Sequence, residues 1–234
     1  MTTANILMIA TSAAQMDNGD ATGVWLEELT TPYYAFSDAG ADVTLASITG
    51  GAIPVDQRSV APAGENDASV ERYLNDADLT AKVAQTPRFT DIDPGQFDAI
   101  FLPGGHGTMF DYPDDLDLAA LVEAFDRAGK VVAAVCHGPA GLVQAKAADG
   151  TPLVKGRRVA AFTDSEEHAV GLQDAVPFLL ETKLKDLGAT HEAAPDFEAF
   201  AVRDGTLVTG QNPASAQKTA DLVLQAVADI RAAA

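Results

Sequence analysis

The sequence has few positive charges and almost no cysteine. It contains 15 Lys and Arg against 34 Asp and Glu, so its formal net charge is −19. A chain this acidic is repelled by the phosphates of nucleic acids and by anionic membranes, and we expect neither as a partner. Its one cysteine excludes an internal disulfide, which favours a reducing compartment, and we expect the cytoplasm.

Long apolar runs and recognisable cofactor motifs are missing as well. No run approaches the roughly 18 residues that a membrane-spanning helix needs. Residues 1–14 lack the basic region of a signal peptide, and we expect a buried strand there instead. No phosphate loop or dinucleotide fingerprint occurs. We expect no metal and no cofactor, because no short paired spacing links His106, His137, His168 and His191.

Short apolar runs alternate with longer helical patterns along the chain. This alternation predicts an α/β fold, a flavodoxin-like three-layer α/β/α sandwich with a mostly parallel central sheet. We expect one domain over residues 1–234, with an insertion at about 50–96 packed over the edge of the site. The predicted strands cover 6–10, 42–48, 97–102, 131–135 and 158–162, followed by a hairpin of 200–203 and 206–209. The predicted helices cover 22–39, 116–128, 138–147, 175–187 and 213–233.

The segment VVAAVCHGPAGL, residues 131–142, places the single cysteine at the end of a predicted strand. Gly138 permits a sharp turn, and Pro139 suits the first turn of a helix. Cys136 is therefore expected on a nucleophile elbow, with an outward sulfur that the helix N-terminus favours as a thiolate. A free cysteine is more often a small buried hydrophobic residue, and the following His-Gly-Pro favours the elbow. His137 is a candidate base or proton shuttle.

Three further segments carry candidate polar groups. The glycine cluster of FLPGGHGTMFDY, residues 101–112, also follows a strand, and its backbone N–H groups could hold a developing oxyanion. Glu28 lies on an apolar helix face, where the pKa of a carboxyl rises and the group can shuttle protons, but the pattern alone favours a solvated surface pair. After the predicted strand 158–162 come Asp164, Glu166 and Glu167, each a candidate to orient His137, and spacing does not choose among them.

These segments together resemble the ThiJ/PfpI superfamily of class I glutamine amidotransferase-like proteins. The resemblance covers nearly the whole chain and rests on TGVWLEE, PGGHGTMFDYP, AVCHGPAGL, AFTDSEE and DGTLVTGQNPASA. More narrowly, the chain is similar to the branch with glutathione-independent glyoxalase III and small heat-shock chaperones. It lacks the long N-terminal extension of larger chaperone members and shows no copy of their two-histidine-plus-carboxylate metal site. The separated His-x-Glu of amidotransferases is also missing.

The resemblance implies roles for individual residues. Cys136 matches the family nucleophile, His137 the triad histidine and Glu28 the helix glutamate that contacts the cysteine. The third triad member follows the FTD segment, which by counting is Glu167. Gly105 matches an oxyanion-hole donor. We place three more residues with Gly105 in the substrate-binding group: His106, Phe110 and Trp25. Tyr33 is expected beside Trp25 and Phe110 in a small apolar pocket. The family fold is usually dimeric, which implies a homodimer.

The leading hypothesis is conversion of methylglyoxal or a related 2-oxoaldehyde to a 2-hydroxy acid such as D-lactate, without a cofactor. The thiolate of Cys136 would attack the aldehyde, and His137 or Glu28 would move a proton through an enediol to give a thioester. Two alternatives remain open at this point. The same groups suit a hydrolase of amide, peptide or ester bonds, and the family resemblance also allows a holdase chaperone, a stress-response protein or a redox sensor.

Overall fold

The computed structural model describes residues 3–233, so residues 1, 2 and 234 of the predicted domain lie outside the described part. Six strands form one sheet in the order β2-β1-β3-β4-β8-β7. All neighbours are parallel except β7, which pairs antiparallel with β8. These strands are β1 (Asn5–Ala10), β2 (Asp42–Ser47), β3 (Ala99–Leu102), β4 (Val131–Val135), β7 (Ala201–Asp204) and β8 (Leu207–Gly210).

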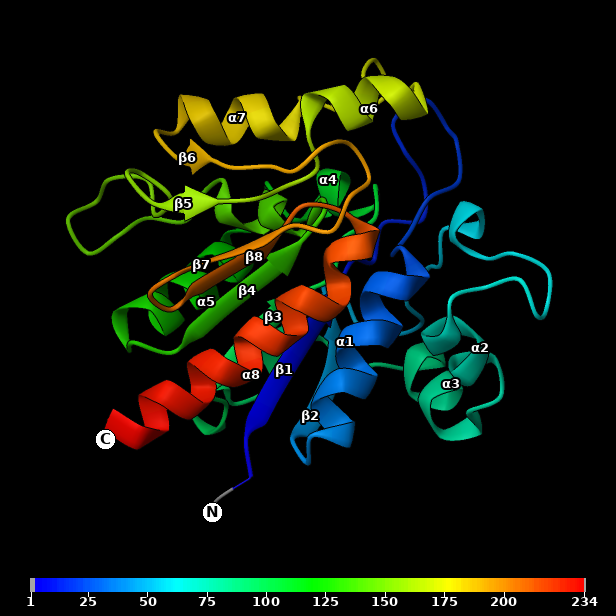
Figure 1. The fold of residues 1–234 in the computed structure, drawn as a ribbon, viewed down its shortest axis with the longest axis horizontal. Coiled ribbons are helices and arrows are strands. Elements are labelled where there is room, and N and C mark those ends of the chain that lie inside the picture. The colour runs from blue at the N-terminus through cyan, green and yellow to red at the C-terminus, as the bar shows by residue number, and fades with distance from the viewer. Residues whose placement is uncertain (1–2, 234) are drawn as a thin grey trace.

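Helices cover both faces of this sheet. The helices α1 (Leu26–Asp38) and α8 (Ala216–Ala233) lie side by side in front of it in Figure 1, and α5 (Leu116–Arg127) lies behind it. Alternate residues of β1 face the two sides, with Ile6 and Met8 in one core and Leu7 and Ile9 in the other. The predicted three-layer sandwich with a mostly parallel sheet is confirmed.

The segment predicted as an insertion contains more regular structure than its weak patterns indicated. It holds two short helices, α2 (Ala68–Leu74) and α3 (Ala77–Ala84), together with several 3₁₀ turns. The N-caps Asp67 and Asp76 accept hydrogen bonds from the first turns of these helices. Helix α2 packs against α1 beside the sheet (Figure 1). Residues 54–56 run along residues 22–24, joined by a parallel bridge between Val24 and Val55.

Two predicted elements at the site were wrong. Residues 138–147 do not form a helix, and only Gly138–Leu142 form a 3₁₀ turn, η4. Its glycines allow close packing, since a Cβ on Gly138 would lie 2.2 Å from the Leu102 carbonyl oxygen. The predicted strand 158–162 is reduced to β5 (Arg158–Val159), which pairs with β6 (Thr190–His191) in a separate sheet. Beyond Val159 the backbone N–H groups of Ala160 and Phe162 donate instead to Thr209 Oγ1 and the Cys136 carbonyl.

Other boundaries differ from the prediction for local reasons. Helix α1 begins at Leu26, because residues 22–25 are extended beside the 54–56 segment. Turns occupy residues 173–175, so the predicted helix 175–187 becomes α7 (Leu180–Asp186). The closing helix opens with a 3₁₀ turn, Pro213–Ser215. The predicted C-terminal hairpin forms, with Gly205 at φ 61° in its turn. Among residues 3–233, no helix is both long and apolar enough to cross a membrane.

One helix is missing from the predicted helices, although the sequence held a signal for it. Helix α6 (Asp164–Val170) begins after Thr163, whose hydroxyl accepts a hydrogen bond from the Glu166 N–H. The Glu166 carboxylate in turn accepts from the Thr163 N–H, which completes a capping box. Short helix α4 (Thr108–Asp111) follows the glycine loop after β3 and begins after Gly107 without a side-chain cap. Both helices begin close to the carboxyl edge of the sheet.

Candidate active site

Cys136 follows the last residue of β4 in a left-handed backbone conformation, with φ 59°. A non-glycine residue there costs roughly 1–2 kcal/mol, so its surroundings must hold it. The Cys136 N–H donates to the Gly210 carbonyl at 2.9 Å, and its own carbonyl accepts from the Phe162 N–H at 2.9 Å. Neighbouring chain on both sides thus fixes the elbow. The thiol is only 3 % exposed, so the predicted outward sulfur is instead enclosed.

A chain of polar contacts runs from the cysteine to a carboxylate on α6. Cys136 Sγ lies 3.3 Å from His137 Nδ1. On the other side of the ring, His137 Nε2 lies 2.7 Å from Glu167 Oε2. Of the three acids that spacing left open, the structure places only Glu167 against His137. Glu166 caps α6, and Asp164 binds Thr182 at the surface.

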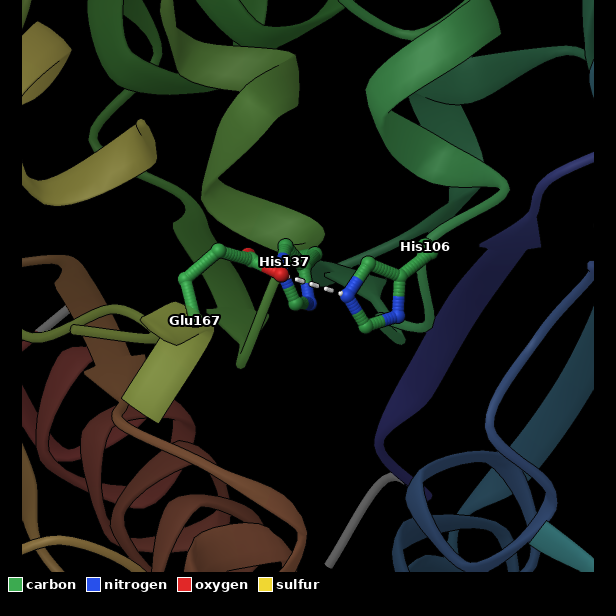
Figure 2. Close-up of side chains that lie close together, drawn as sticks. All are labelled: His106, His137 and Glu167. Atoms are coloured by element: carbon green, nitrogen blue, oxygen red, sulfur yellow. Dashed lines mark hydrogen bonds and ion pairs between the residues drawn. The ribbon is translucent and has the colours of Figure 1, made fainter. Parts of the chain in front are cut away.

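Glu167 also binds a second histidine, from the glycine loop. His106 Nε2 lies 2.9 Å from Glu167 Oε1, so each carboxylate oxygen contacts one imidazole. Figure 2 shows the two rings side by side, with His106 reaching toward Glu167 past His137. Their centroids are 4.2 Å apart, and both rings are almost completely buried. This pairing was not predicted, because the two histidines lie in loops that follow different strands.

The charge on Glu167 determines which ring nitrogens carry protons. Burial alone would raise the pKa of Glu167, but hydrogen bonds from His106 and His137 outweigh it and hold this pKa well below its usual range. The carboxylate is therefore ionised and can only accept, so both histidines donate through Nε2–H. Burial lowers the pKa of His106 to about 4, and the neighbouring His137 adds to this. His106 is consequently neutral near pH 7.

Glu28 from α1 is fully buried beside the cysteine. Its Oε2 accepts a hydrogen bond from the Gly104 N–H at 2.9 Å, whereas Oε1 has no partner with hydrogen-bond geometry among the described residues. Burial raises the pKa of Glu28 well above its usual range, and the adjacent Cys136 thiol partly opposes this rise. The raised pKa favours the protonated carboxyl, which makes Glu28 a candidate proton donor. Glu28 thus lies beside Cys136, where the family resemblance placed it.

The predicted thiolate was wrong for the resting state. Burial is the main cause that raises the pKa of the Cys136 thiol well above its usual value. The expected helix N-terminus is absent, since η4 is a 3₁₀ turn of five residues. Cys136 therefore rests as a thiol that must lose its proton during reaction. In the neutral imidazole that donates through Nε2–H, His137 Nδ1 carries a lone pair 3.3 Å from the sulfur and is positioned to accept this proton.

The glycine loop after β3 packs tightly against the elbow and residues 22–25. Gly105 has φ 100°, and a Cβ there would lie 2.4 Å from both the Gly23 carbonyl oxygen and the Trp25 nitrogen. A Cβ on Gly104 would lie 2.8 Å from the His137 nitrogen. Within the described residues, the Gly105 N–H makes no hydrogen bond. It is therefore available as a hydrogen-bond donor, and its role toward an oxyanion stays a prediction.

The aromatic residues around the site differ from those expected. Trp25 and Phe110 are half-buried near the glycine loop, but the Tyr33 hydroxyl accepts from Lys82 of α3 instead. Phe162, which the sequence did not single out, stacks on His137 with ring centroids 4.6 Å apart. It also meets the exposed Phe197 at 6.3 Å. In the sequence, only its place in the FTD segment, part of the family resemblance, drew attention to Phe162.

The remaining histidines lie apart from this cluster. His168 is exposed, and its Nδ1 lies 2.6 Å from the Asp164 carbonyl oxygen within α6. His191 lies beside Ala161 and Glu181. In the described part of the chain, one group of three side chains could hold a metal ion, with ligand atoms all within 4.8 Å: His106, His137 and Glu167. The Nε2 atoms of this group already donate to the carboxylate, so hydrogen bonds account for the arrangement.

The fold and this cysteine elbow place the protein in a known class. The chain belongs to the DJ-1/PfpI family, whose model matches residues 21–226.

Within the family it is similar to glyoxalases. "Glyoxalase 3" of Candida albicans is 36% identical over 89% of this chain and 91% of its own length. "Glutathione-independent glyoxalase HSP31" of Saccharomyces cerevisiae is 33% identical over 87% and 88%. The crystal structure of glyoxalase III from Candida albicans superposes with a TM-score of 0.85, at 33% identity over 95% and 97%.

Proposed function

We propose that this chain is a glutathione-independent glyoxalase that converts methylglyoxal, or a related 2-oxoaldehyde, to a 2-hydroxy acid. The observation that carries the proposal is the linked series Cys136–His137–Glu167, with contacts of 3.3 Å and 2.7 Å, at a strained elbow. The similarity to named glyoxalases over nearly the whole chain supports it.

The first step is formation of a bond between sulfur and the aldehyde carbon. His137 Nδ1 takes the thiol proton of Cys136, and Glu167 stabilises the resulting imidazolium. The sulfur then attacks the aldehyde. The unpaired N–H of Gly105 holds the oxygen while it carries negative charge. Protonation of that oxygen gives a hemithioacetal, with the hydroxyl on the carbon bonded to sulfur.

The second step is an internal redox isomerisation through an enediol. One proton leaves carbon 1 while one arrives at the oxygen on carbon 2. Another then arrives at carbon 2 while one leaves the oxygen on carbon 1, and the product is a thioester. The neutral Glu28 is a proton donor in this step, and His137 is the base. Water then cleaves the thioester, which releases the 2-hydroxy acid and restores the thiol.

The test is turnover of methylglyoxal without glutathione. We expect the purified chain to consume methylglyoxal and produce D-lactate, and we expect Cys136→Ala to lose this activity completely because no other cysteine exists. The exposed Glu198→Gln serves as a matched surface control. Wild-type protein that consumes no methylglyoxal but hydrolyses an activated ester with a burst would contradict the glyoxalase proposal and favour acyl hydrolysis.

We also infer a homodimer in the cytoplasm. The family resemblance supports the dimer, and the single free cysteine supports a reducing compartment. Sedimentation at twice the 24.3 kDa chain mass is the expected result, and a monomer would contradict the dimer.

A further inference from the structure

A buried nitrogen at the centre of the site has no partner. His106 Nδ1 has no hydrogen bond among the described residues, although the residue is only 5 % exposed. A buried polar atom without a partner costs about 1–3 kcal/mol, so native proteins rarely keep one without a reason. A ligand that completes the hydrogen bond is one such reason.

The chemical character of this nitrogen follows from the other side of the ring. His106 Nε2 donates its proton to the ionised Glu167 carboxylate at 2.9 Å. A neutral imidazole carries only one N–H, so Nδ1 holds a lone pair and can only accept. Figure 2 shows Nδ1 on the edge of the His106 ring that is turned away from Glu167. Nδ1 can therefore accept a hydrogen bond from a ligand that carries a donor, such as a hydroxyl group.

The position of the ring limits which hydroxyl can reach it. His106 packs 4.2 Å from the His137 ring, centroid to centroid, and His137 itself contacts the Cys136 sulfur. The peptide nitrogen of Gly105, the oxyanion donor, directly precedes His106 in the same loop. A small molecule bonded to the sulfur and held by Gly105 thus lies next to this loop.

We propose that His106 Nδ1 is the acceptor for the hydroxyl on carbon 1 of the substrate bound to Cys136. This inference rests on the proposed glyoxalase function. The hydroxyl arises when the sulfur adds to the aldehyde, and its proton must leave when the thioester carbonyl forms. Nδ1 accepts a hydrogen bond from that hydroxyl and so orients the intermediate while the proton on carbon 1 leaves, and the Glu167 carboxylate holds the ring in place. The hydroxyl proton passes to the Glu28 carboxylate, which has given its own proton to the oxygen on carbon 2, and water supplies the thiol proton when it cleaves the thioester. His106 is in this account a catalytic residue.

Two amide substitutions of His106 test the roles of its two ring nitrogens one at a time. In His106→Asn the side-chain oxygen can occupy the place of Nδ1, which keeps the acceptor and removes the donor to Glu167. In His106→Gln the amide nitrogen can occupy the place of Nε2, which keeps the donor to Glu167 and removes the acceptor. We expect kcat for methylglyoxal to fall roughly 100-fold in His106→Gln and no more than about tenfold in His106→Asn, with KM changed little in both.

A glutamine variant as active as the asparagine variant, or more active, would overturn the proposal, since His106 would then act only through Glu167. Thermal melting and the rate of Cys136 alkylation by iodoacetamide verify that both variants fold with a normal thiol site. Should either variant unfold, His106→Ala replaces the pair. Added imidazole is then expected to restore its turnover several-fold, and no restoration would overturn the proposal. Wild-type protein without turnover would instead refute the glyoxalase function, and this inference with it.

Discussion

At the scale of single residues, the site is built around two buried carboxyls whose pKa values are shifted in opposite directions. Glu167 receives two imidazole N–H groups, which lower its pKa and keep it ionised, whereas Glu28 receives one backbone N–H and its raised pKa favours the protonated form. The difference arises from the number of donors, because both carboxyls are buried. One acid therefore orients and stabilises charge, and the other is available to transfer a proton.

This division predicts the effect of Glu28→Gln. The amide keeps an acceptor for Gly104 N–H and stays neutral like the protonated acid, but it cannot transfer a proton. We expect turnover of methylglyoxal to fall about 100-fold, while the rate of Cys136 alkylation by iodoacetamide stays within a few-fold. The neighbouring Glu27→Gln is the matched control and should leave turnover unchanged. Full turnover in Glu28→Gln would exclude the proton-transfer role.

The sequence allowed prediction of some of these residues but not of their network. Cys136 and His137 could be selected because a glycine and a proline follow them at a strand end. Glu167 could be separated from Asp164 and Glu166 only through the family resemblance. The bond between His106 and Glu167 joins residues 61 positions apart, and no local pattern encodes it. The high pKa of the thiol also depends on tertiary burial, which spacing does not report.

At the scale of elements, the site depends on loops that follow adjacent strands. The loop after β3 supplies Gly105, and the turn after β4 supplies Cys136. Helix α6 is fixed to the end of β8 by Glu166, whose Oε1 accepts from Gln211, Asn212 and the Phe197 N–H. That clamp places the next residue, Glu167, against His137. The packing of α6 thus determines the geometry of the triad.

Asp111 at the end of α4 holds the loop after β1 against the glycine loop. Its Oδ2 accepts from the Thr11 hydroxyl and from the N–H groups of Ser12 and Ala13. Its Oδ1 is buried without a partner among the described residues. Burial raises the pKa of Asp111 to about 6, although these hydrogen bonds oppose the rise. The loop junction therefore carries a carboxylate that is costly to ionise near neutral pH.

This raised pKa predicts a pH-dependent stability difference. The folded state binds the Asp111 proton more tightly than the unfolded chain, so the stability that it contributes is present below about pH 4 and is lost as the pH rises to about 6. Asp111→Asn removes this dependence. We expect the free energy of unfolding of the variant, relative to wild type, to increase by about 1 kcal/mol between about pH 5 and about pH 8. Urea titrations measure it.

The exposed Asp114→Asn is the control for this comparison and should show no such trend. If the difference in unfolding free energy between Asp111→Asn and wild type is constant with pH, or falls as the pH rises, the pKa of Asp111 is not raised in the folded state.

Element types were easier to predict than element boundaries. The buried strands β1, β3 and β4 could be found because continuous apolar runs of this length fit a sheet covered on both faces. Residues 138–147 could not be predicted correctly from their helical pattern. Gly138 and Gly141 there pack directly against Leu102, and such close tertiary packing overrides local preference. The capping box of α6 was present in the sequence as TDSE and would have predicted that helix.

At the scale of the whole molecule, the parallel sheet explains why distant segments form one site. The strands β1, β3, β4 and β8 run in the same direction, so residues that follow each strand gather at one edge. The segment 54–59 closes against residues 22–26 at the same end, with Ser59 Oγ accepting from the Leu26 N–H. Cys136 is thereby enclosed from several sides, which favours chemistry on a small substrate and keeps bulk water away from the reactive intermediates that precede the thioester.

The central claim is that methylglyoxal becomes covalently bonded to Cys136 during turnover. The most direct measurement is the intact mass of the protein, quenched with acid while it consumes methylglyoxal, followed by mapping of the modified peptide. We predict a mass increase of one methylglyoxal molecule on Cys136, which hydroxylamine removes as the lactoyl hydroxamate expected from a thioester. Turnover at a normal rate in Cys136→Ala, or an adduct confined to arginine and lysine side chains, would contradict the account.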